Sequence, residues 1–548
     1  MLKKHKDSLV YVYAIIIGML IFIAVYGIKV LNPLYTDWLF GKAKDLSQHY
    51  LGWEFYRKGD WTFPFGLTNQ IAYPTYTSVI FTDSIPLFAV FFKLISPLLP
   101  GDFQYFGWWG ILCFALQGFF AAKILRELNV GRVQTLLGCI LFILSPTVIE
   151  KMFRHTALGG HWIILLSIYL FVLHNKNYKN ILKTSLQWGI IGILIASIHL
   201  YYLPMCGIFA IAYVLCSFFK ERKIDIKFAL PFILFMIGIV INTYLLGGFS
   251  SKADLGSDGL GEYSFNLNGF FNPKGYSRFF ESLNTYKDGQ YEGFAYLGLG
   301  IFILLFISVF YFFINIKKKE ENIDKEKLFY ILMYICISIG LILFSASPQV
   351  SFNDKLLFEF PDIDIIIKYW SVFRASGRMV WPVCYLIYIC VIVCNDRLWK
   401  NINLNKTIPI ILLAICVILQ VTDLSAKLKG QRKAFAKEVT YTSPLQEEIW
   451  YEIPKIEEVS HIVCTSNNFS ADDYLTLAKY AHDNDFTINN FYFARGIDVR
   501  ENIKYSLEHL DNKSIYLFYI DEKETALNYG LYLYETDKFI VGTTFKVM

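Results

Sequence analysis

One short polar segment, Asp45-Leu46-Ser47-Gln48-His49, combines the residue types best suited to acid–base chemistry. If residues 42–58 form a helix, Asp45, Gln48, His49 and Gly52 share one face, because positions three and four apart are neighbours on a helix. A carboxylate, an amide and an imidazole would then converge, as in a site where a base removes a proton. The alternative is a solvated helix beside a membrane, since most polar residues on loops are simply hydrated.

The composition places this segment in a membrane protein. Of the 548 residues, 55% are hydrophobic and 18% aromatic, and the mean hydropathy is +0.41. Many apolar runs are long enough to cross a bilayer. We predict an all-α polytopic membrane protein with about eleven transmembrane helices, at residues 9–29, 104–126, 134–150, 160–174, 186–201, 203–219, 228–246, 294–315, 328–346, 379–395 and 407–422.

The distribution of lysine and arginine predicts how these helices are oriented. Basic segments alternate along the chain and are assigned to the cytoplasm by the positive-inside rule: 3–6, 126–132, 176–183, 220–223, 317–327 and 397–406. The N-terminus is then cytoplasmic, while the first loop (30–103), the loops near 151–159, 247–293 and 347–378, and the C-terminal tail lie outside. The apolar stretch 85–99 is broken by prolines, and we expect it to lie along the outer interface.

A second domain is predicted after the membrane part. We expect a transmembrane domain at 1–424, a linker near 423–437 and an extracytoplasmic α/β domain at 425–548, because short apolar strands alternate there with helical stretches. The predicted strands are 461–464, 487–494, 514–520 and 539–545, and the predicted helices are 471–482, 502–510 and 522–534.

Further titratable residues lie in the segments predicted to be outside. Asp83 precedes the interfacial stretch, where it is either a second candidate base or a helix N-cap. Arg154, His155 and His161 lie where one span ends and the next begins, and they could bind a phosphate or tune a carboxylate, or they could be interfacial anchors. His199 lies at the end of a span, where an unpaired histidine is costly, so we expect it to face a cavity.

Polar residues suited to a glycan or a phosphate are also predicted to be outside. Tyr202, Asn266, Asn268 and Glu292 can hydrogen-bond sugar hydroxyls, and tyrosine can stack on a sugar ring. The alternative for the asparagine-rich part is a turn-forming loop. Arg374 and Arg378 stand one helical turn apart at the predicted outer start of a span, and arginine forks match phosphate oxygens.

The layout and several motifs resemble the GT-C superfamily of integral-membrane glycosyltransferases. The shared features are the long first outer loop with an acid, a tight cytoplasmic turn at 129–132 and a span that ends in Ser145-Pro146. More closely, five segments resemble a bacterial family of GT-C-like membrane proteins that is distantly similar to the YfhO-type lipoteichoic-acid glycosylation proteins: 41–57, 81–86, 264–273, 290–298 and 373–382.

The resemblance implies an inverting glycosyltransferase of the bacterial plasma membrane. Its donor would be a polyprenyl-phosphate-linked sugar and its acceptor a glycan or other component of the cell envelope. The position that matches the family's catalytic acid is Asp45, with Gln48 and His49 orienting it, and Asp37 and Asp83 remain rival bases. Arg374 and Arg378 would hold the phosphate, helped by Arg154 or His155. The first loop lacks an Asp-x-Asp pair, so no cofactor is predicted, although a divalent metal is left open.

Two other classes of function remain open. The protein could be a flippase or transporter of a lipid-linked glycan, or a non-catalytic glycan-binding membrane protein. A transporter would need charged or broken helices at mid-membrane, whereas the polar residues here gather at one predicted face. Basic residues are not clustered with aromatic ones on an outer element, so no nucleic acid is expected as a partner.

Overall fold

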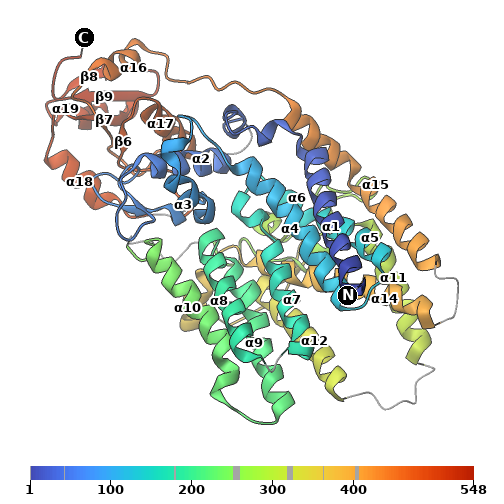
Figure 1. The fold of residues 1–548 in the computed structure, drawn as a ribbon. Coiled ribbons are helices and arrows are strands. Elements are labelled where there is room, and N and C mark those ends of the chain that lie inside the picture. Colours follow the sequence, from blue (N-terminus) through green and yellow to red (C-terminus); the bar gives the residue numbers. More distant parts are fainter. Residues whose placement is uncertain are drawn as a thin grey trace.

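The computed structural model describes residues 2–41, 44–177, 180–250, 259–316, 325–361, 363–401, 407–495 and 497–547. A bundle of helices forms one end of the molecule, a small α/β domain forms the other, and the first loop lies between them (Figure 1). Three basic segments predicted to be cytoplasmic lie partly outside the described residues, at 178–179, 317–324 and 402–406, as does 251–258 of the predicted loop 247–293.

Each predicted span contains a helix of the bundle. Within the described ranges, ten helices are long and apolar enough to cross a membrane, and α11 is apolar over the shorter stretch Leu299–Phe310. The chain is therefore a multi-pass membrane protein. The helices are α1 (Leu2–Tyr26), α4 (Phe106–Glu127), α5 (Arg132–Ile143) with α6 (Pro146–Lys151), α7 (Trp162–Asn177), α8 (Ile181–Ile198), α9 (Tyr202–Glu221), α10 (Leu230–Leu245), α11 (Leu299–Ile316), α12 (Lys325–Ala346), α14 (Trp381–Asn401) and α15 (Ile408–Ala436).

Glycines set how closely some of these helices pack. A Cβ on Gly192 of α8 would lie 2.2 Å from the Phe235 carbonyl oxygen of α10, and one on Gly238 of α10 would lie 2.4 Å from the Gly189 oxygen of α8. In a bilayer, helices associate through van der Waals contact, so small residues at a crossing let the two backbones touch. The pair α8–α10 is packed in this way.

The first loop folds onto the end of the bundle. It contains α2 (Lys44–Lys58), the short strands β1 (Leu67–Thr68) and β2 (Thr77–Ser78), the 3-10 turn η3 (Val79–Thr82) and α3 (Pro86–Leu94). The helix predicted at 42–58 is thus present from residue 44 on, with 42–43 outside the described residues. Nine residues of α3 span only about 14 Å, which is too short to cross a bilayer.

A structured segment replaces the simple loop expected at 347–378. Strands β3 (Gln349–Phe352) and β4 (Lys355–Glu359) form an antiparallel hairpin, followed by α13 (Asp364–Ser371) and the 3-10 turn η9 (Ser376–Val380). The sequence did not reveal this hairpin. Its strands are short, and the second is exposed along its whole length and lacks the alternation of apolar and polar residues that marks a half-buried strand.

The C-terminal domain is the predicted α/β domain. A five-stranded sheet has the order β6-β5-β7-β9-β8, in which β6, β5 and β7 are parallel and the pairs β7–β9 and β9–β8 are antiparallel. The elements are α16 (Glu448–Glu452), β5 (His461–Cys464), α17 (Ala471–Asp483), β6 (Thr487–Ile488), α18 (Arg500–Glu508), β7 (Ser514–Tyr519), α19 (Lys523–Leu527), β8 (Tyr532–Glu535) and β9 (Phe539–Thr543).

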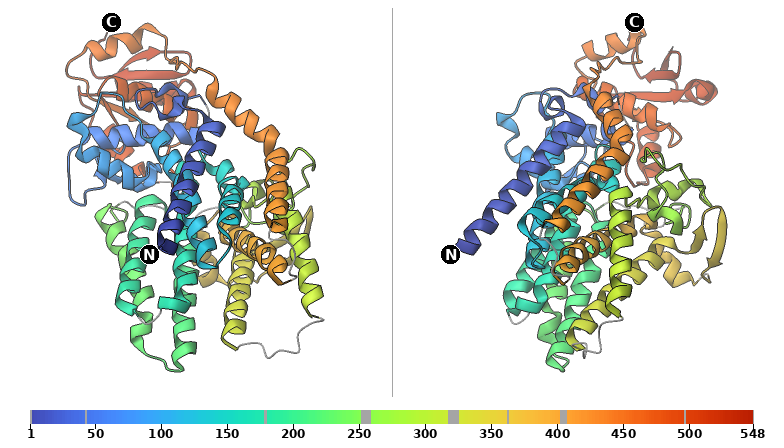
Figure 2. Two further views of the ribbon diagram at one scale, coloured as in Figure 1. Left: turned by 45° about the vertical axis from the view of Figure 1, so that its right-hand side comes forward. Right: turned by 90° about the vertical axis from the view of Figure 1, so that its right-hand side faces the viewer.

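Two predictions about this part were wrong. The stretch 522–534 is a short helix that ends at Leu527, a turn in which Gly530 adopts a positive φ of 67°, and then strand β8. The linker expected at 423–437 is, except for its last residue, the second half of α15, which runs without a break past residue 424 and rises from the bundle toward the C-terminal domain (Figure 2). Its Ala, Lys, Leu, Gln and Arg residues are all good helix formers.

The C-terminal domain packs directly on the first loop. The Lys58 ammonium lies 2.6 Å from Asp485 Oδ1, and the backbone N–H groups of Ile488 and Ala494 donate to the carbonyls of Gln70 and Phe81. Leu51 and Phe55 of α2 share one apolar cluster with residues of α17 and the sheet. Because of these contacts, the segment that follows β6 lies at the end of the membrane bundle.

Candidate active site

Asp45 is the centre of a polar site at the end of the bundle. It lies in the first turn of α2, and its side chain is 25% exposed. Its Oδ2 lies 3.1 Å from Nδ1 of His155, and its Oδ1 accepts a hydrogen bond of 3.5 Å from the Tyr492 hydroxyl. The first loop, the α6–α7 connection and the C-terminal domain therefore meet at this carboxylate.

His155 connects Asp45 to a second carboxylate. Its Nε2 lies 3.3 Å from Oε1 of Glu292, which belongs to the 3-10 turn η8 (Asp288–Gly293). Burial lowers the pKa of His155, while its hydrogen bond to Glu292 pulls the pKa in the opposite direction. The imidazole thus forms a bridge between a partly exposed acid and a buried one.

Glu292 pairs with two buried cations. Its Oε2 lies 2.5 Å from Nζ of Lys151 and 2.9 Å from Nε of Arg378, and the Lys151 and Glu292 side chains are 1% and 5% exposed. Burial alone would raise the pKa of Glu292, but Arg378 and Lys151 outweigh it and hold this pKa well below its usual range. Glu292 therefore stays ionised and fixes both cations.

Two glycines make the pairing of Glu292 with Arg378 possible. A Cβ on Gly377 would lie 2.7 Å from the Cα of Gly293, so the turns η8 and η9 touch through their backbones. The Gly377 N–H also donates to the Tyr263 carbonyl at 3.0 Å. Each glycine is the chain neighbour of one member of the ion pair, and this close approach sets the distance between their side chains.

Asp83 forms a second acid–histidine pair. Its Oδ1 lies 3.6 Å from Nε2 of His199, and its side chain is 20% exposed. Burial, and then the nearby Asp45 carboxylate, raise the pKa of Asp83 to about 7, against the opposing charges of Arg378 and Arg374. Burial holds the pKa of His199 well below its usual value. Near neutral pH, Asp83 is therefore partly protonated.

The backbone at Asp83 is strained and fixed by α2. Asp83 and Ile85 have positive φ values of 52° and 55°, which are unfavourable for residues with a Cβ and cluster at functional sites. A Cβ on Gly52 would lie 2.3 Å from that of Thr82, so α2 presses on this turn. The N-cap of α3 is Ile85 without a side-chain bond, and the alternative of Asp83 as a cap was wrong.

We expect replacement of Asp83 by asparagine to change how stability depends on pH. A carboxyl whose pKa is raised by folding stabilises the fold when protonated, so the free energy of unfolding falls as pH rises from about 4 to about 7. Asp83→Asn mimics the protonated form. Its stability relative to wild type should therefore increase by about 2–3 kcal/mol between pH 5 and pH 8.

Thermal unfolding of the purified protein from pH 5 to pH 8 measures this difference. The exposed Asp60 of the same loop provides the matched control, and Asp60→Asn should follow wild type at every pH. Parallel curves for Asp83→Asn and wild type would show that Asp83 does not take up a proton in this range.

Arg374 differs from the other cations of the site. It is exposed, and among the described residues its side chain forms no hydrogen bond or ion pair. It lies close enough to Asp83 and Tyr492 for its charge to lower their pKa values. Arg378, by contrast, is buried, bonded to Glu292 and stacked 5.0 Å from the Tyr201 ring centre. The two arginines predicted to act as a pair therefore occupy different environments.

The expected convergence of Asp45, Gln48 and His49 was only partly right. Gln48 Nε2 donates to the Tyr492 carbonyl, and so holds the residue whose hydroxyl contacts Asp45. His49 is fully buried, and its Nδ1 lies 3.2 Å from the Thr156 hydroxyl. Burial lowers the pKa of His49 to about 3. The imidazole that contacts Asp45 is that of His155, because the second turn of α2 is buried against the bundle and His49 lies there.

The remaining predicted residues have structural partners. Arg154 pairs with Glu150 and stacks 5.1 Å from the Tyr291 ring centre. His161 Nδ1 lies 2.7 Å from the Tyr385 hydroxyl, and the Tyr202 hydroxyl donates to the Leu158 carbonyl. The side-chain amides of Asn266 and Asn268 donate hydrogen bonds to neighbouring loop atoms, including Gln290 Oε1 and the Asn284 carbonyl. The structure does not bring these groups to Asp45.

Sequence reasoning missed Lys151 and Tyr492. A signal for Lys151 existed, since a lysine at the end of a span that is predicted to be outside runs against the positive-inside rule. Tyr492 lies 447 positions from Asp45 along the chain, and no local pattern links the two. In the part of the chain that the structure describes, no group of three or more His, Cys, Asp or Glu side chains could hold a metal ion.

Comparisons with known proteins give a family and weak structural likenesses. The Archaeoglobus fulgidus oligosaccharyltransferase in its apo form is 11% identical with a TM-score of 0.45, over 94% of this chain and 70% of that chain. The structure of oligosaccharyltransferase AglB from Archaeoglobus fulgidus with an inhibitory peptide and a dolichol-phosphate is 10% identical with a TM-score of 0.42, over the same shares. These scores are too low to transfer an activity, and no curated protein matches the chain.

Two family profiles cover most of the sequence. Residues 449–544 match the family described as the DUF6311 C-terminal domain. Residues 15–425, about three quarters of the chain, match the family described as Domain of unknown function (DUF6311), and the chain therefore belongs to the DUF6311 family.

Proposed function

We propose that this protein is a membrane glycosyltransferase that moves a sugar from a polyprenyl-phosphate-linked donor to a cell-envelope acceptor, with inversion at the anomeric carbon. The observation that carries the proposal is a partly exposed acid, Asp45, at the end of a membrane bundle, together with an exposed cation, Arg374, whose charge acts on the same neighbours, Tyr492 and Asp83. A base and a phosphate-binding group next to the bilayer are what such a reaction requires.

In the proposed reaction, Asp45 acts as the base. Its carboxylate takes the proton of the acceptor hydroxyl while that oxygen attacks the anomeric carbon. The bond between this carbon and the phosphate oxygen breaks, and polyprenyl phosphate leaves with the electron pair. Asp45 then releases the proton to water. Asp83 is partly protonated near neutral pH, which makes it less available as a base.

The other residues of the site support this step. Tyr492 and His155 fix the Asp45 carboxylate from two sides. Arg374 would bind the donor phosphate, since its side chain is exposed and an arginine fork can hold two phosphate oxygens. Arg378, held by Glu292, is a positioning residue that supplies positive charge behind the site.

The site end of the protein would face the outside of a bacterial plasma membrane, with the N-terminus in the cytoplasm. The basic segments of the chain fit this orientation under the positive-inside rule. The test is reconstitution in liposomes with radiolabelled polyprenyl-phosphate hexoses and cell-envelope glycans as acceptors. Transfer of label to an acceptor is the expected result. Movement of the labelled lipid across the bilayer without transfer would instead indicate a flippase.

We expect replacement of Arg374 to weaken donor binding. Arg374→Ala should raise the KM for the polyprenyl-phosphate sugar by about 10- to 100-fold, since a hydrogen bond to a charged group contributes about 1.5–3 kcal/mol. Arg374→Lys should restore part of the affinity, because lysine keeps the charge but loses the fork. The exposed Arg278 in another loop provides the control, and an unchanged KM in Arg374→Ala would remove this residue from the donor site.

A further inference from the structure

The C-terminal sheet has the connectivity at which α/β folds bind ligands. From β5 the chain passes through α17 to β6 on one side, then returns through α18 to β7 on the other side of β5. The direction in which successive strands are added to the sheet therefore reverses between the parallel strands β5 and β7. In open α/β sheets, ligands bind outside the carboxyl ends of the strands at such a switch point.

The helices that flank this switch point cover opposite faces of the sheet. Ile462 and Cys464 of β5 lie in an apolar cluster with Leu477 of α17. Val463, between them, lies in a different cluster, against which Leu507 of α18 packs. A crevice between the two connections is the expected consequence of this arrangement.

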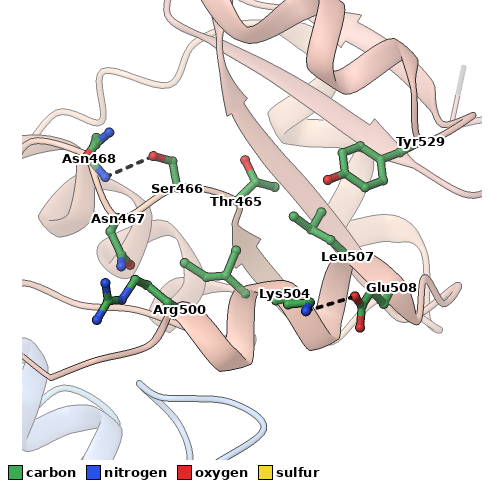
Figure 3. Close-up of a pocket in the computed structure, with 10 residues that line it drawn as sticks. Thr465, Ser466, Asn467, Asn468, Arg500, Lys504, Leu507, Glu508 and Tyr529 are labelled. Carbon is green, nitrogen blue, oxygen red and sulfur yellow. Dashed lines mark hydrogen bonds and ion pairs between the residues drawn. The ribbon is translucent and has the colours of Figure 1, made fainter.

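A cavity of about 470 Å³ lies at this position. It is lined by the loop that follows β5, Thr465–Asn468, by one side of α18 and by Tyr529 after α19 (Figure 3). Its volume lies within the range of about 300–1,000 Å³ that is usual for small-molecule sites. The cavity shares no lining residue with the site around Asp45.

The lining groups suit a ligand rich in hydroxyls. Asn467 and Asn468 are exposed, and the Asn468 side chain forms no hydrogen bond among the described residues. An amide can donate to and accept from sugar hydroxyls, and the ring of Tyr529 offers an apolar face (Figure 3).

The cations of the cavity do not favour an anionic ligand. Arg500 Nη2 lies 2.8 Å from Asp498 Oδ2, and Lys504 Nζ lies 3.8 Å from Glu508 Oε1. Each positive charge is therefore matched by an acidic partner within four residues along the chain. This balance of charge fits a neutral ligand better than a phosphate or a carboxylate.

We propose that this cavity binds a neutral saccharide, as a subsite for the acceptor glycan. The identity of the ligand as an acceptor rests on the proposed transferase function, whereas the position of the site rests on the sheet alone. The C-terminal domain would then hold the growing glycan while its Tyr492 contacts the catalytic carboxylate of the membrane part.

The test is saturation-transfer NMR on the purified full-length protein in nanodiscs. The probes are the methyl glycosides of glucose, galactose, mannose, N-acetylglucosamine and glucuronic acid. At least one neutral glycoside should bind to wild type, and Asn468→Trp, which fills the cavity, should weaken its binding at least tenfold. Asn528→Ala changes an exposed amide outside the cavity and should bind as wild type does.

Several results would overturn this proposal. They are the absence of binding by every neutral glycoside, a preference for glucuronic acid, and equal binding by Asn468→Trp and wild type. If Asn468→Trp does not fold, the smaller change Asn468→Ala replaces it, with a loss of about threefold or more expected. The assay contains no donor, so its failure would leave the proposed transfer intact, and a failure of transfer would leave this site standing.

Discussion

Asp45→Asn should lower the rate of sugar transfer by about 10²- to 10⁴-fold, while the protein folds and binds the donor as wild type does. Asparagine keeps the shape of the side chain and can still hydrogen-bond to His155 and Tyr492, but it cannot take up the proton of an attacking hydroxyl. The loss should therefore appear in kcat and leave the KM for the donor nearly unchanged.

The reconstituted liposome assay with radiolabelled polyprenyl-phosphate hexoses measures this effect. Asp60→Asn changes an exposed carboxylate of the same loop and should transfer sugar at the wild-type rate. Asp37→Asn tests the rival acid of that loop and should lose little activity. Undiminished transfer by Asp45→Asn would refute its role as base, and a large loss in Asp37→Asn would assign that role to Asp37.

Glu292→Gln should destabilise the protein by about 3–5 kcal/mol, the largest effect on folding that we expect from a single polar residue of the site. The carboxylate neutralises Lys151 and Arg378, which lie 2.5 Å and 2.9 Å from its Oε2. Glutamine has a similar size but no charge, so two buried cations would lose their counter-ion. The substitution therefore measures the effect of the charge alone, because glutamine fills the same space and leaves no cavity.

Unfolding by sodium dodecyl sulfate in mixed micelles measures this difference. Glu281→Gln, an exposed change in the same loop, should be neutral within about 0.5 kcal/mol. The double variant Glu292→Gln/Arg378→Gln should lose less stability than the sum of the two single variants, since it removes one of the unpaired cations along with the carboxylate. Additive losses, or a stable Glu292→Gln, would show that the pair contributes little to the fold.

The lengths of the apolar runs by themselves determined the membrane architecture. A helix must satisfy its own backbone hydrogen bonds in lipid, so an apolar stretch of spanning length has only one viable structure. All eleven predicted spans accordingly contain helices within the described residues. The helix of Asp45 and most strands of the C-terminal domain were also predictable, because their patterns are local.

Local patterns failed where a contact between distant segments decided the structure. Strand β8 was predicted as helix, yet it pairs with β9 at the edge of the sheet. The hairpin β3–β4 was predicted as loop, although an isolated bridge links Ser351 of this hairpin to Asn266 in the loop before α11. Pairing partners that are far away in sequence override local preference.

The sequence named most residues of the site, but it could not say which of them touch. It paired Asp45 with His49 and Arg374 with Arg378 by helical spacing. The structure pairs Asp45 with His155 of the α6–α7 connection. It pairs Arg378 with Glu292, because Gly293 and Gly377 bring their two loops into backbone contact. Residue type fixes the chemistry that a side chain can perform, whereas the packing of remote segments decides which partner it meets. The local spacing of residues along the chain does not predict that packing.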